Sequence, residues 1–184
     1  MTLREHEFRV LRETIAVRGT VRMVLVPFSL SCWALLAGGL VVFSGWPIAA
    51  VLSLAVLVGG FEAVHALHVG VERIGRYIQV FYEADPLGPR WETTAMRTGP
   101  GLPGGGVDPL FTLLFVGACV ANLVVIFIPP PSPYEASALI ALHVAFIVRV
   151  MRARLAAARQ RVRDLETFQR LHAGDQASPT RPTV

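Results

Sequence analysis

Lysine is absent from this chain of 184 residues, and all 17 residues with a permanent positive charge are arginines. Charged residues make up 16% of the sequence and hydrophobic residues 53%, and the mean hydropathy is +0.54. A soluble domain contains about 25% charged residues. The shortage of charge argues against an ordinary soluble domain and indicates a protein that lies in a membrane.

Motifs of the common catalytic classes are also missing. The sequence contains no Gly-x-Ser-x-Gly, no phosphate-binding P-loop and no His-Glu-x-x-His. The two cysteines, Cys32 and Cys119, lie within apolar runs, so we expect them to be small core residues. We therefore predict no catalytic residues and no enzymatic activity.

Four apolar stretches have about the length that a helix needs to cross a bilayer, roughly 20 residues. They cover residues 21–43, 46–68, 109–128 and 134–150. Arginines precede the first stretch, lie between the second and third, and follow the fourth, whereas the connections "SGWP" and "PPPSPYE" contain none. The positive-inside rule therefore predicts that both termini and the middle loop are cytoplasmic. The predicted fold class is an all-α integral membrane protein of the inner (cytoplasmic) membrane, with four transmembrane helices in two hairpins.

This topology divides the chain into five predicted segments. They are a cytoplasmic N-terminal amphipathic helix at 1–20, a first transmembrane hairpin with a long second helix at 21–83, a flexible cytoplasmic loop at 84–108, a second hairpin with a basic helical extension at 109–172, and a disordered tail at 173–184. The loop is rich in proline and glycine, so we expect little regular structure in it.

The second predicted helix is too long for the membrane. No proline interrupts residues 48–83, and a helix over 47–83 would be roughly 55 Å long, against a hydrocarbon core of roughly 30 Å. It should therefore leave the membrane near His68 and continue into the cytoplasm, as should the fourth helix beyond its apolar stretch. The adjacent residues Gly59 and Gly60 are the weakest point of this prediction, because glycine destabilises a helix interior.

Three faces can be drawn on this helix from its period of 3.6 residues. The polar stripe comprises Glu62, His65, His68, Glu72, Arg73, Arg76, Gln79 and Glu83. A ridge of small residues predicts close helix packing and comprises Ala55, Gly59, Ala63, Ala66 and Gly70. An apolar face predicts a second packing surface and comprises Val64, Leu67, Val71, Ile74 and Ile78. Beyond His68 we interpret the polar stripe as a solvated face with pairs such as Glu72–Arg76.

The candidate functional residues are the polar groups at membrane depth, namely Glu62, His65, His68, Asn122 and His143. Glu62 lies roughly 22 Å from the outer end of its helix, inside the hydrocarbon, so it should face protein. Its expected partners are His65, Asn122 or His143.

Three uses of these polar groups remain open. They form interhelical hydrogen bonds in a structural, scaffolding or accessory subunit, they form a proton or cation path, or they bind haem or a metal. The metal ligands would be Glu62, His65, His68 and His143, which are weak candidates because the first three spread over about 120° of one helix. We predict no metal site and no cofactor, and the structural use is favoured.

The segment 148–172 is predicted to extend the fourth helix and is strongly basic. Its Met151, Leu155, Ala158, Val162, Leu165, Gln169 and His172 repeat at alternating spacings of four and three residues, as in a coiled-coil seam. The seam packs on the second helix and the N-terminal helix, or self-associates, or its arginines lie on anionic lipid headgroups. The expected partners are thus the lipid bilayer, its anionic headgroups, and a second copy or another membrane protein. Nucleic acid is not expected, because topology explains the excess of positive charge.

Overall fold

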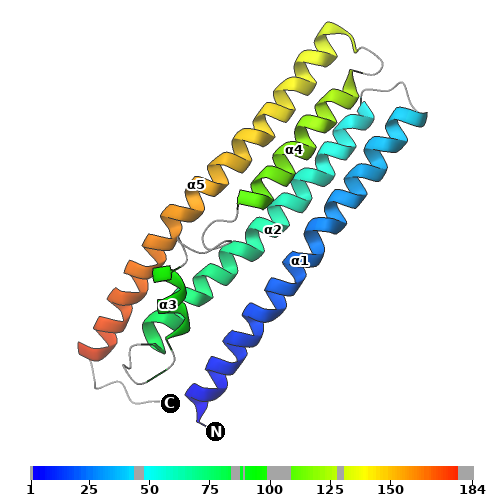
Figure 1. Ribbon diagram of the computed structural model, residues 1–184. Coiled ribbons are helices and arrows are strands. Elements are labelled where there is room, and N and C mark those ends of the chain that lie inside the picture. Colours follow the sequence, from blue (N-terminus) through cyan, green and yellow to red (C-terminus); the bar gives the residue numbers. More distant parts are fainter. Residues whose placement is uncertain are drawn as a thin grey trace. The chain divides into compact units, whose positions relative to one another are not determined.

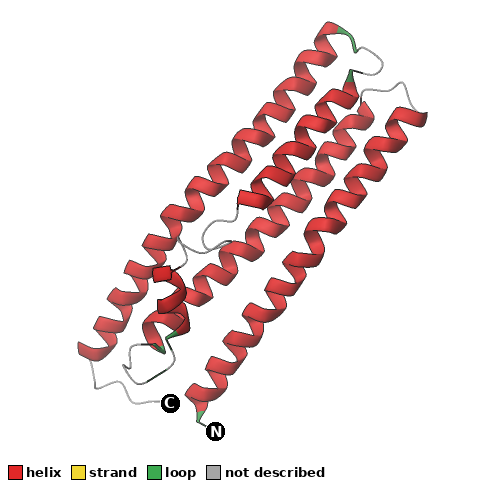
Figure 2. Cartoon of the chain, in the orientation of Figure 1, coloured by secondary structure: helices red, strands yellow, loops and turns green. Residues whose placement is uncertain are grey.

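The computed structural model describes residues 2–43, 48–83, 88, 90–98, 109–127 and 131–177. Within these ranges the chain forms five helices and no strand (Figure 1, Figure 2), so the predicted all-helical class is confirmed. The helices are α1 (Leu3–Phe43), α2 (Ile48–Phe81), α3 (Trp91–Thr98), α4 (Pro109–Ile126) and α5 (Pro133–Ala177). Among them α1, α2 and α5 are long and apolar enough to cross a membrane, which indicates a membrane protein. Helix α4 is shorter and contains no charged residue.

The long helices are uninterrupted. Helix α2 continues for 34 residues through Gly59 and Gly60, which confirms the prediction of one unbroken helix. Helix α1 joins the predicted N-terminal helix and the first apolar stretch in a single element of 41 residues. Helix α5 has 45 residues and ends at Ala177. Residues 173–177 of the predicted disordered tail are therefore helical, and residues 178–184 lie outside the described part of the chain.

The predicted flexible loop contains a helix. Helix α3 occupies eight residues of the segment 84–108, so the expectation of little regular structure was wrong there. A short helix of this kind is marginal by itself and depends on contacts from outside it, which are described below. Residues 84–87, 89 and 99–108 of the predicted loop lie outside the described ranges.

The chain divides into two compact units. Unit 1 comprises Met1–Gly19, His68–Val107 and Ala156–Val184, and unit 2 comprises Thr20–Leu67 and Asp108–Leu155. Unit 2 thus contains the four apolar stretches of the sequence almost entirely. On α2 the division falls at His68, where the sequence predicts that this helix leaves the membrane.

Unit 2 has a core to which α1, α2, α4 and α5 all contribute. Its buried residues are Val26, Leu54, Leu57, Phe61, Val64, Phe115, Ala118, Cys119, Phe146, Val150 and Ala153. The ring of Phe61 on α2 meets the ring of Phe115 on α4 edge-on at 5.6 Å and that of Phe146 on α5 at 5.9 Å. Cys119 is fully buried, which agrees with its expected place as a core residue.

Close helix packing in unit 2 occurs at Gly60, not on the predicted ridge. A Cβ atom at Gly60 would lie 2.5 Å from Ser29 Oγ and 2.6 Å from Ser29 Cβ on α1. At Gly59, in contrast, nothing lies within 4 Å. The ridge residues Ala55, Gly59, Ala63 and Ala66 are exposed, so the predicted close packing does not occur there within the described chain. The fifth ridge residue, Gly70 in unit 1, does lie closely against Arg18 of α1.

The predicted apolar face of α2 is confirmed as a packing face. Val64 in unit 2 and Ile78 in unit 1 are buried, and Leu67, Val71 and Ile74 are half-buried. Small residues and branched apolar residues both predict helix contacts from sequence, but only the apolar face buries enough surface to be stabilised by packing.

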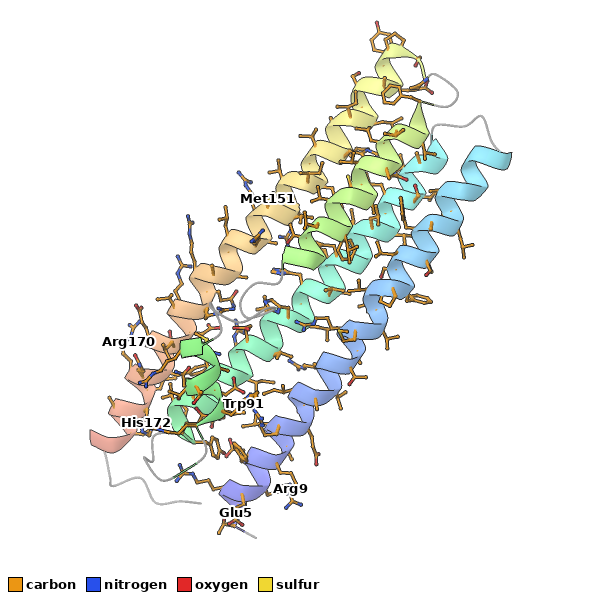
Figure 3. The ribbon with its side chains drawn as sticks, in the orientation of Figure 1. Glu5, Arg9, Trp91, Met151, Arg170 and His172 are labelled. Carbon is orange, nitrogen blue, oxygen red and sulfur yellow. The ribbon has the colours of Figure 1, made fainter. Side chains whose placement is uncertain are left out.

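In unit 1, α2 packs against both α1 and α5. The Tyr77 hydroxyl donates a hydrogen bond to Glu7 of α1, 3.0 Å away. The Tyr77 ring meets that of Phe168 on α5 edge-on at 5.6 Å. His172, near the end of α5 (Figure 3), meets Phe81 edge-on at 5.1 Å. Residues later in α2 therefore contact residues later in α5, so these two helices run in the same direction within the unit.

Most of the predicted seam of α5 lies outside this contact, and His172 is the seam residue that takes part in it. In unit 1 the seam residues Ala158, Val162 and Gln169 are exposed, whereas Leu165 and His172 are half-buried. In unit 2, Met151 and Leu155 are exposed as well. The face of α5 that meets α2 includes Asp164 and Phe168, and it lies beside the seam. The interpretation that the seam packs on α2 and α1 was therefore wrong for most of its residues, and of the seam His172 contacts α2.

Replacing Gly60 by alanine is expected to destabilise unit 2 by about 1–3 kcal/mol, the usual cost of overpacking. The new methyl group would overlap the Ser29 side chain, which is itself buried. Thermal unfolding of the purified protein in detergent would measure the change.

Two controls make this test specific. Gly59→Ala should leave stability unchanged or raise it by up to about 1 kcal/mol, because alanine favours a helix and the position is open. Ser29→Gly combined with Gly60→Ala should restore most of the loss. Equal destabilisation by both alanine variants would contradict the packing described here.

Candidate functional site

The buried polar groups of unit 2 form one cluster around Asn122 of α4. The Asn122 Oδ1 atom accepts hydrogen bonds from Trp33 Nε1 of α1 at 3.2 Å and from Ser53 Oγ of α2 at 2.6 Å. Its Nδ2 group donates to the carbonyl oxygen of Ala50 at 3.2 Å and lies 3.0 Å from His143 Nε2 of α5. A side-chain amide has two acceptor and two donor positions, and in Asn122 all four are used, on three other helices.

The cluster determines the protonation of His143. Because Asn122 Nδ2 has only hydrogens to offer, His143 Nε2 must accept, so the proton of a neutral imidazole lies on Nδ1. That nitrogen is 2.7 Å from the carbonyl oxygen of Leu139, which accepts its hydrogen bond. Turning the Asn122 amide over would place its NH₂ group against the N–H of Trp33. An imidazolium at His143 would point its Nε2–H at the Asn122 NH₂ group, donor against donor, so the cluster fits a neutral ring.

Sequence reasoning found Asn122 and His143 but missed two members of this cluster. Ser53 is fully buried, and Trp33 is half-buried. Both lie in apolar stretches where serine and tryptophan are common. Neither residue could be singled out from sequence as a member of a polar cluster, because the sequence does not show which face of its helix meets α4.

Glu62, the first predicted functional residue, pairs with Arg149 of α5. The Arg149 Nη2 group donates to Glu62 Oε2 at 2.7 Å, and the two side chains are 45% and 40% exposed respectively. The Arg149 guanidinium also lies 6.0 Å from the centre of the Phe61 ring. In the described part of the chain no hydrogen bond joins Glu62 to a predicted partner: Asn122 and His143 bind each other, and His65 acts on Glu62 only through its charge. Arg149 was treated as a topology marker and its reach toward α2 was overlooked.

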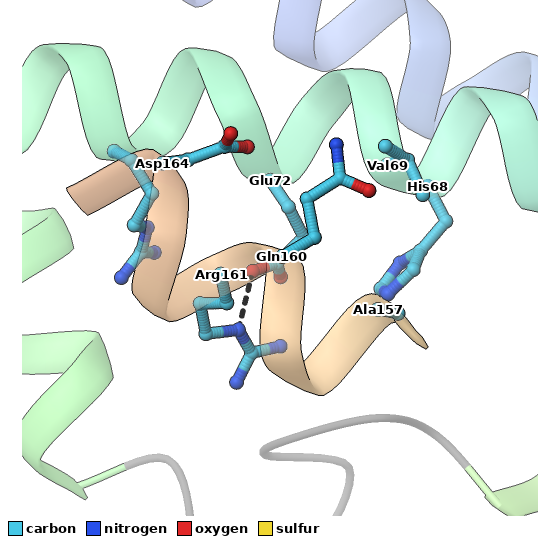
Figure 4. A pocket seen from close by; sticks show the side chains of 8 residues that line it. His68, Val69, Glu72, Ala157, Gln160, Arg161 and Asp164 are labelled. Atoms are coloured by element: carbon cyan, nitrogen blue, oxygen red, sulfur yellow. Dashed lines mark ion pairs between the residues drawn. The ribbon is translucent and has the colours of Figure 1, made fainter. Parts of the chain in front are cut away.

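His65 and His68 fall in different units. In unit 2, the His65 ring stacks on the Phe61 ring of the preceding turn, with centres 5.8 Å apart and planes 3° from parallel. In unit 1, His68 lines a small hollow between α2 and α5 (Figure 4) with a volume of about 10 Å³. That is about the space needed by a single water molecule. Glu72 and Arg161 flank the hollow and form an ion pair, with Arg161 Nε 2.8 Å from Glu72 Oε2. This contact does not have the geometry of a hydrogen bond.

Arg76 is a buried charge at the centre of unit 1. Arg76 is 4% exposed, and burial lowers the pKa of its guanidinium below the ordinary value. Its Nη1 group donates to Gln79 Oε1 at 3.1 Å, and Nη2 lies 3.8 Å from Glu92 Oε2 of α3. Glu92 also accepts a hydrogen bond of 2.8 Å from Arg12 of α1. Arg76 is thus neutralised by α3, and α3 in turn is held by α1.

Glu83 fixes the beginning of α3. Its carboxylate accepts hydrogen bonds from the backbone N–H groups of Glu92 and Thr93 and from the Thr93 hydroxyl, each at 2.7 Å. The first N–H groups of a helix have no partner inside it, and the helix dipole favours a negative charge there. Glu83 is only 5% exposed, so these bonds replace its water. This contact explains why a segment rich in glycine and proline contains a helix.

The interpretation of the cytoplasmic polar stripe as a solvated face was therefore wrong. Arg76 and Glu83 are buried, Glu72 and Gln79 are half-buried, and only Arg73 is exposed. Arg73 itself reaches Asp164 of α5 at 3.3 Å. The charge of Glu72 acts on Arg76 within α2, as expected, but the ion pair of Glu72 is with Arg161 of α5. The polar residues were predicted, but their partners belong to segments distant in sequence.

Tyr77 and Tyr82 complete the polar network of unit 1. Burial, followed by the Glu7 carboxylate, raises the pKa of both phenols above the ordinary value. The Arg4 guanidinium lies 5.4 Å from the centre of the Tyr82 ring and donates to the carbonyl oxygen of Phe81 at 2.7 Å. The two phenols are thus held in their neutral forms at the contact between α1 and α2.

The weak metal candidates do not form a metal centre in the described ranges. No group of three or more histidine, cysteine, aspartate or glutamate side chains lies there in an arrangement that could hold a metal ion. In unit 2, Glu62 accepts a hydrogen bond from Arg149, and His143 is hydrogen-bonded to Asn122. The atoms of these two side chains that could bind a metal are therefore used in other contacts.

The chain matches no protein-family model, and comparisons with curated proteins and with solved structures likewise find no match.

Replacing Asn122 by alanine is expected to destabilise unit 2 by about 2 kcal/mol. Interhelical hydrogen bonds in membranes contribute on average about 0.6 kcal/mol each, and this change removes four. Val124→Ala on the same helix is the matched control, because Val124 is 61% exposed. Unfolding in mixed detergent micelles would measure both variants, and equal stabilities would contradict a central role for the amide.

Proposed function

We propose that the chain is a non-enzymatic, multi-pass membrane protein that acts as a structural, scaffolding or accessory subunit. In this proposal unit 2 lies in the inner (cytoplasmic) membrane, with α4 as a fourth crossing beside α1, α2 and α5. Both termini are cytoplasmic, and unit 1 is the cytoplasmic bundle through which the protein meets its partners.

The observation that carries the proposal is the nature of the buried polar residues in each unit. In unit 2 they are Ser29, Ser53, Asn122 and His143, and in unit 1 they are Arg76 and Glu83. The first four are neutral and the last two are charged. Charges are costly in hydrocarbon, whereas neutral hydrogen-bonded groups are tolerated there. This division supports a membrane location for unit 2 and an aqueous one for unit 1.

The structural use of the cluster is favoured because its hydrogen bonds are complete. A proton relay needs groups that gain and lose protons in turn. His143 is locked as the neutral Nδ1–H form by Asn122 and Leu139, as argued above. The same bonds connect four helices, which is the task of a structural element.

A proton or cation path along Glu62 is the alternative, and one observation favours it. The Glu62–Arg149 pair is half-exposed, and the His65 ring lies one turn along α2 from Glu62. Such a pair could exchange ions with water at the inner boundary of the membrane. The experiment on flux below separates the two functions.

Topology is tested with a cysteine placed at Ser132, in a background with Cys32 and Cys119 replaced by serine. Ser132 is exposed just before α5, and the proposal places it outside. A membrane-impermeant maleimide should label it in intact cells. Reaction only after the membrane is opened would show that the orientation is reversed, and a cysteine at Arg170 should behave in the opposite way.

Flux is tested by reconstituting the purified protein in vesicles with an internal pH-sensitive dye and an imposed potential. The expected result is a proton leak equal to that of protein-free vesicles, for both the wild type and Glu62→Gln. Glu62→Gln keeps the shape of the side chain and one hydrogen bond to Arg149, so the fold should be retained. A wild-type leak that Glu62→Gln abolishes would replace the structural function by the conduction alternative.

A further inference from the structure

The outer face of α5 in unit 1 carries a ridge of exposed arginines. Arg159, Arg163 and Arg170 are all exposed. At 100° per residue they fall within about 40° of one another, along roughly 16 Å of the helix. Arg170 lies on the outer side of α5 (Figure 3). The arginine ridge is therefore a straight basic stripe.

An unpacked apolar stripe runs beside the arginine ridge. Val162 is 57% exposed, Ala158 is exposed and Leu165 is half-buried. They belong to the seam with the spacing of a coiled coil, which is mostly exposed in the described part of unit 1, although its last residue, His172, meets Phe81 of α2. A helix that presents such a seam next to a row of like charges has the form of a docking face for another helix.

We propose that this face of α5 binds an acidic amphipathic helix of another protein. Carboxylates on the partner would meet the arginine ridge, while its apolar residues would cover Ala158 and Val162. The inference rests on the proposed function, because it assumes that unit 1 is cytoplasmic, and it names the chemistry of the partner.

A membrane surface fits the arginine ridge less well. Helix α5 is held along α2 by Arg161–Glu72, by Asp164–Arg73 and by the contact of Phe168 with Tyr77. Helix α5 is one unbroken helix of 45 residues, so if its first part crosses a membrane, the helix directs the ridge away from the membrane surface. If α5 leaves the membrane after Val150, Arg159 lies roughly 14 Å and Arg170 roughly 30 Å further along the helix. Attraction to anionic headgroups fades within a Debye length of about 8 Å.

A second copy of the chain also fits less well. Two identical faces brought together along the seam would place arginine ridges against each other, and like charges in such positions oppose pairing. The one carboxylate on the ridge in the described chain is Glu166, which is exposed. The complement of the face is therefore a helix with carboxylates at i, i+4 and i+11 and a basic residue at i+7.

The test uses two fluorescent helical peptides that carry this pattern, one in each chain direction, and the full-length protein in nanodiscs of zwitterionic lipid. Anisotropy titrations should show saturable binding of at least one peptide. A scrambled peptide of the same composition should bind about eightfold more weakly, because three exposed ion pairs contribute factors of roughly two each.

Matched variants locate the binding. Arg159, Arg163 and Arg170 replaced together by glutamine should weaken binding by about tenfold. The control replaces Arg9, Arg97 and Arg154 by glutamine, which removes the same charge from exposed positions off the ridge, and should change binding by less than about threefold. Equal effects of the two triple variants, or equal binding of the scrambled peptide, would overturn the proposal.

Other occupants give distinct results. New hydrogen-exchange protection of residues 156–177 in discs with anionic lipid would assign the face to headgroups and overturn the proposal. A dimer in dilute detergent that the ridge variant dissociates would assign it to a second copy, with the same consequence. If no peptide binds while the Ser132 cysteine is labelled from outside, the docking inference fails and the proposed function stands. If that labelling fails, the proposed function fails first.

Discussion

The amide of Asn122 is hydrogen-bonded to three other helices, and the arrangement of unit 2 depends on it. Each bond requires a neighbouring helix to present one particular atom at one depth, so the amide fixes both the rotation and the height of its neighbours. Apolar packing alone is less selective, because lipid and side chains are equally apolar and do not choose a register. The core around Phe61 supplies the contact area, and Asn122 determines which faces come into contact.

In unit 1, charged side chains fix the positions of neighbouring segments, as the Asn122 amide does in unit 2. Arg76 is buried and needs an anion, which Glu92 supplies from α3. Helix α3 needs an acceptor for its first N–H groups, which Glu83 supplies from just beyond the end of α2. Each group therefore requires the other segment to be in place. A buried charge is stabilised only when it is paired and hydrogen-bonded, and this mutual dependence orders a segment that would otherwise have no reason to be helical.

Sequence patterns predict the helices well, because they depend on neighbours in sequence. The length of α2 follows from the absence of proline, and its apolar face from a period of 3.6 residues. The partners of the polar residues could not be predicted in this way. Arg149 with Glu62, Ser53 with Asn122 and Glu92 with Arg76 join residues about 16 to 90 positions apart. The interior place of the polar stripe was missed for this reason, since a stripe that faces water and one that faces other helices have the same sequence.

The position of Glu62 now has a physical explanation in terms of what each unit tolerates. Along α2 the polar side chains change from neutral to charged in the order Ser53, Glu62 and Arg76, with bonds to a neutral amide, to a half-exposed arginine and to a buried ion network. A charged pair is cheaper where water or lipid headgroups can reach it than in hydrocarbon. A half-exposed ion pair between a neutral cluster and a charged network therefore fits the boundary of the membrane. The pair of Glu62 with Arg149 joins α2 to α5, and if unit 2 lies in a membrane as proposed, a helix that continues beyond this pair needs charged partners and no longer needs neutral ones.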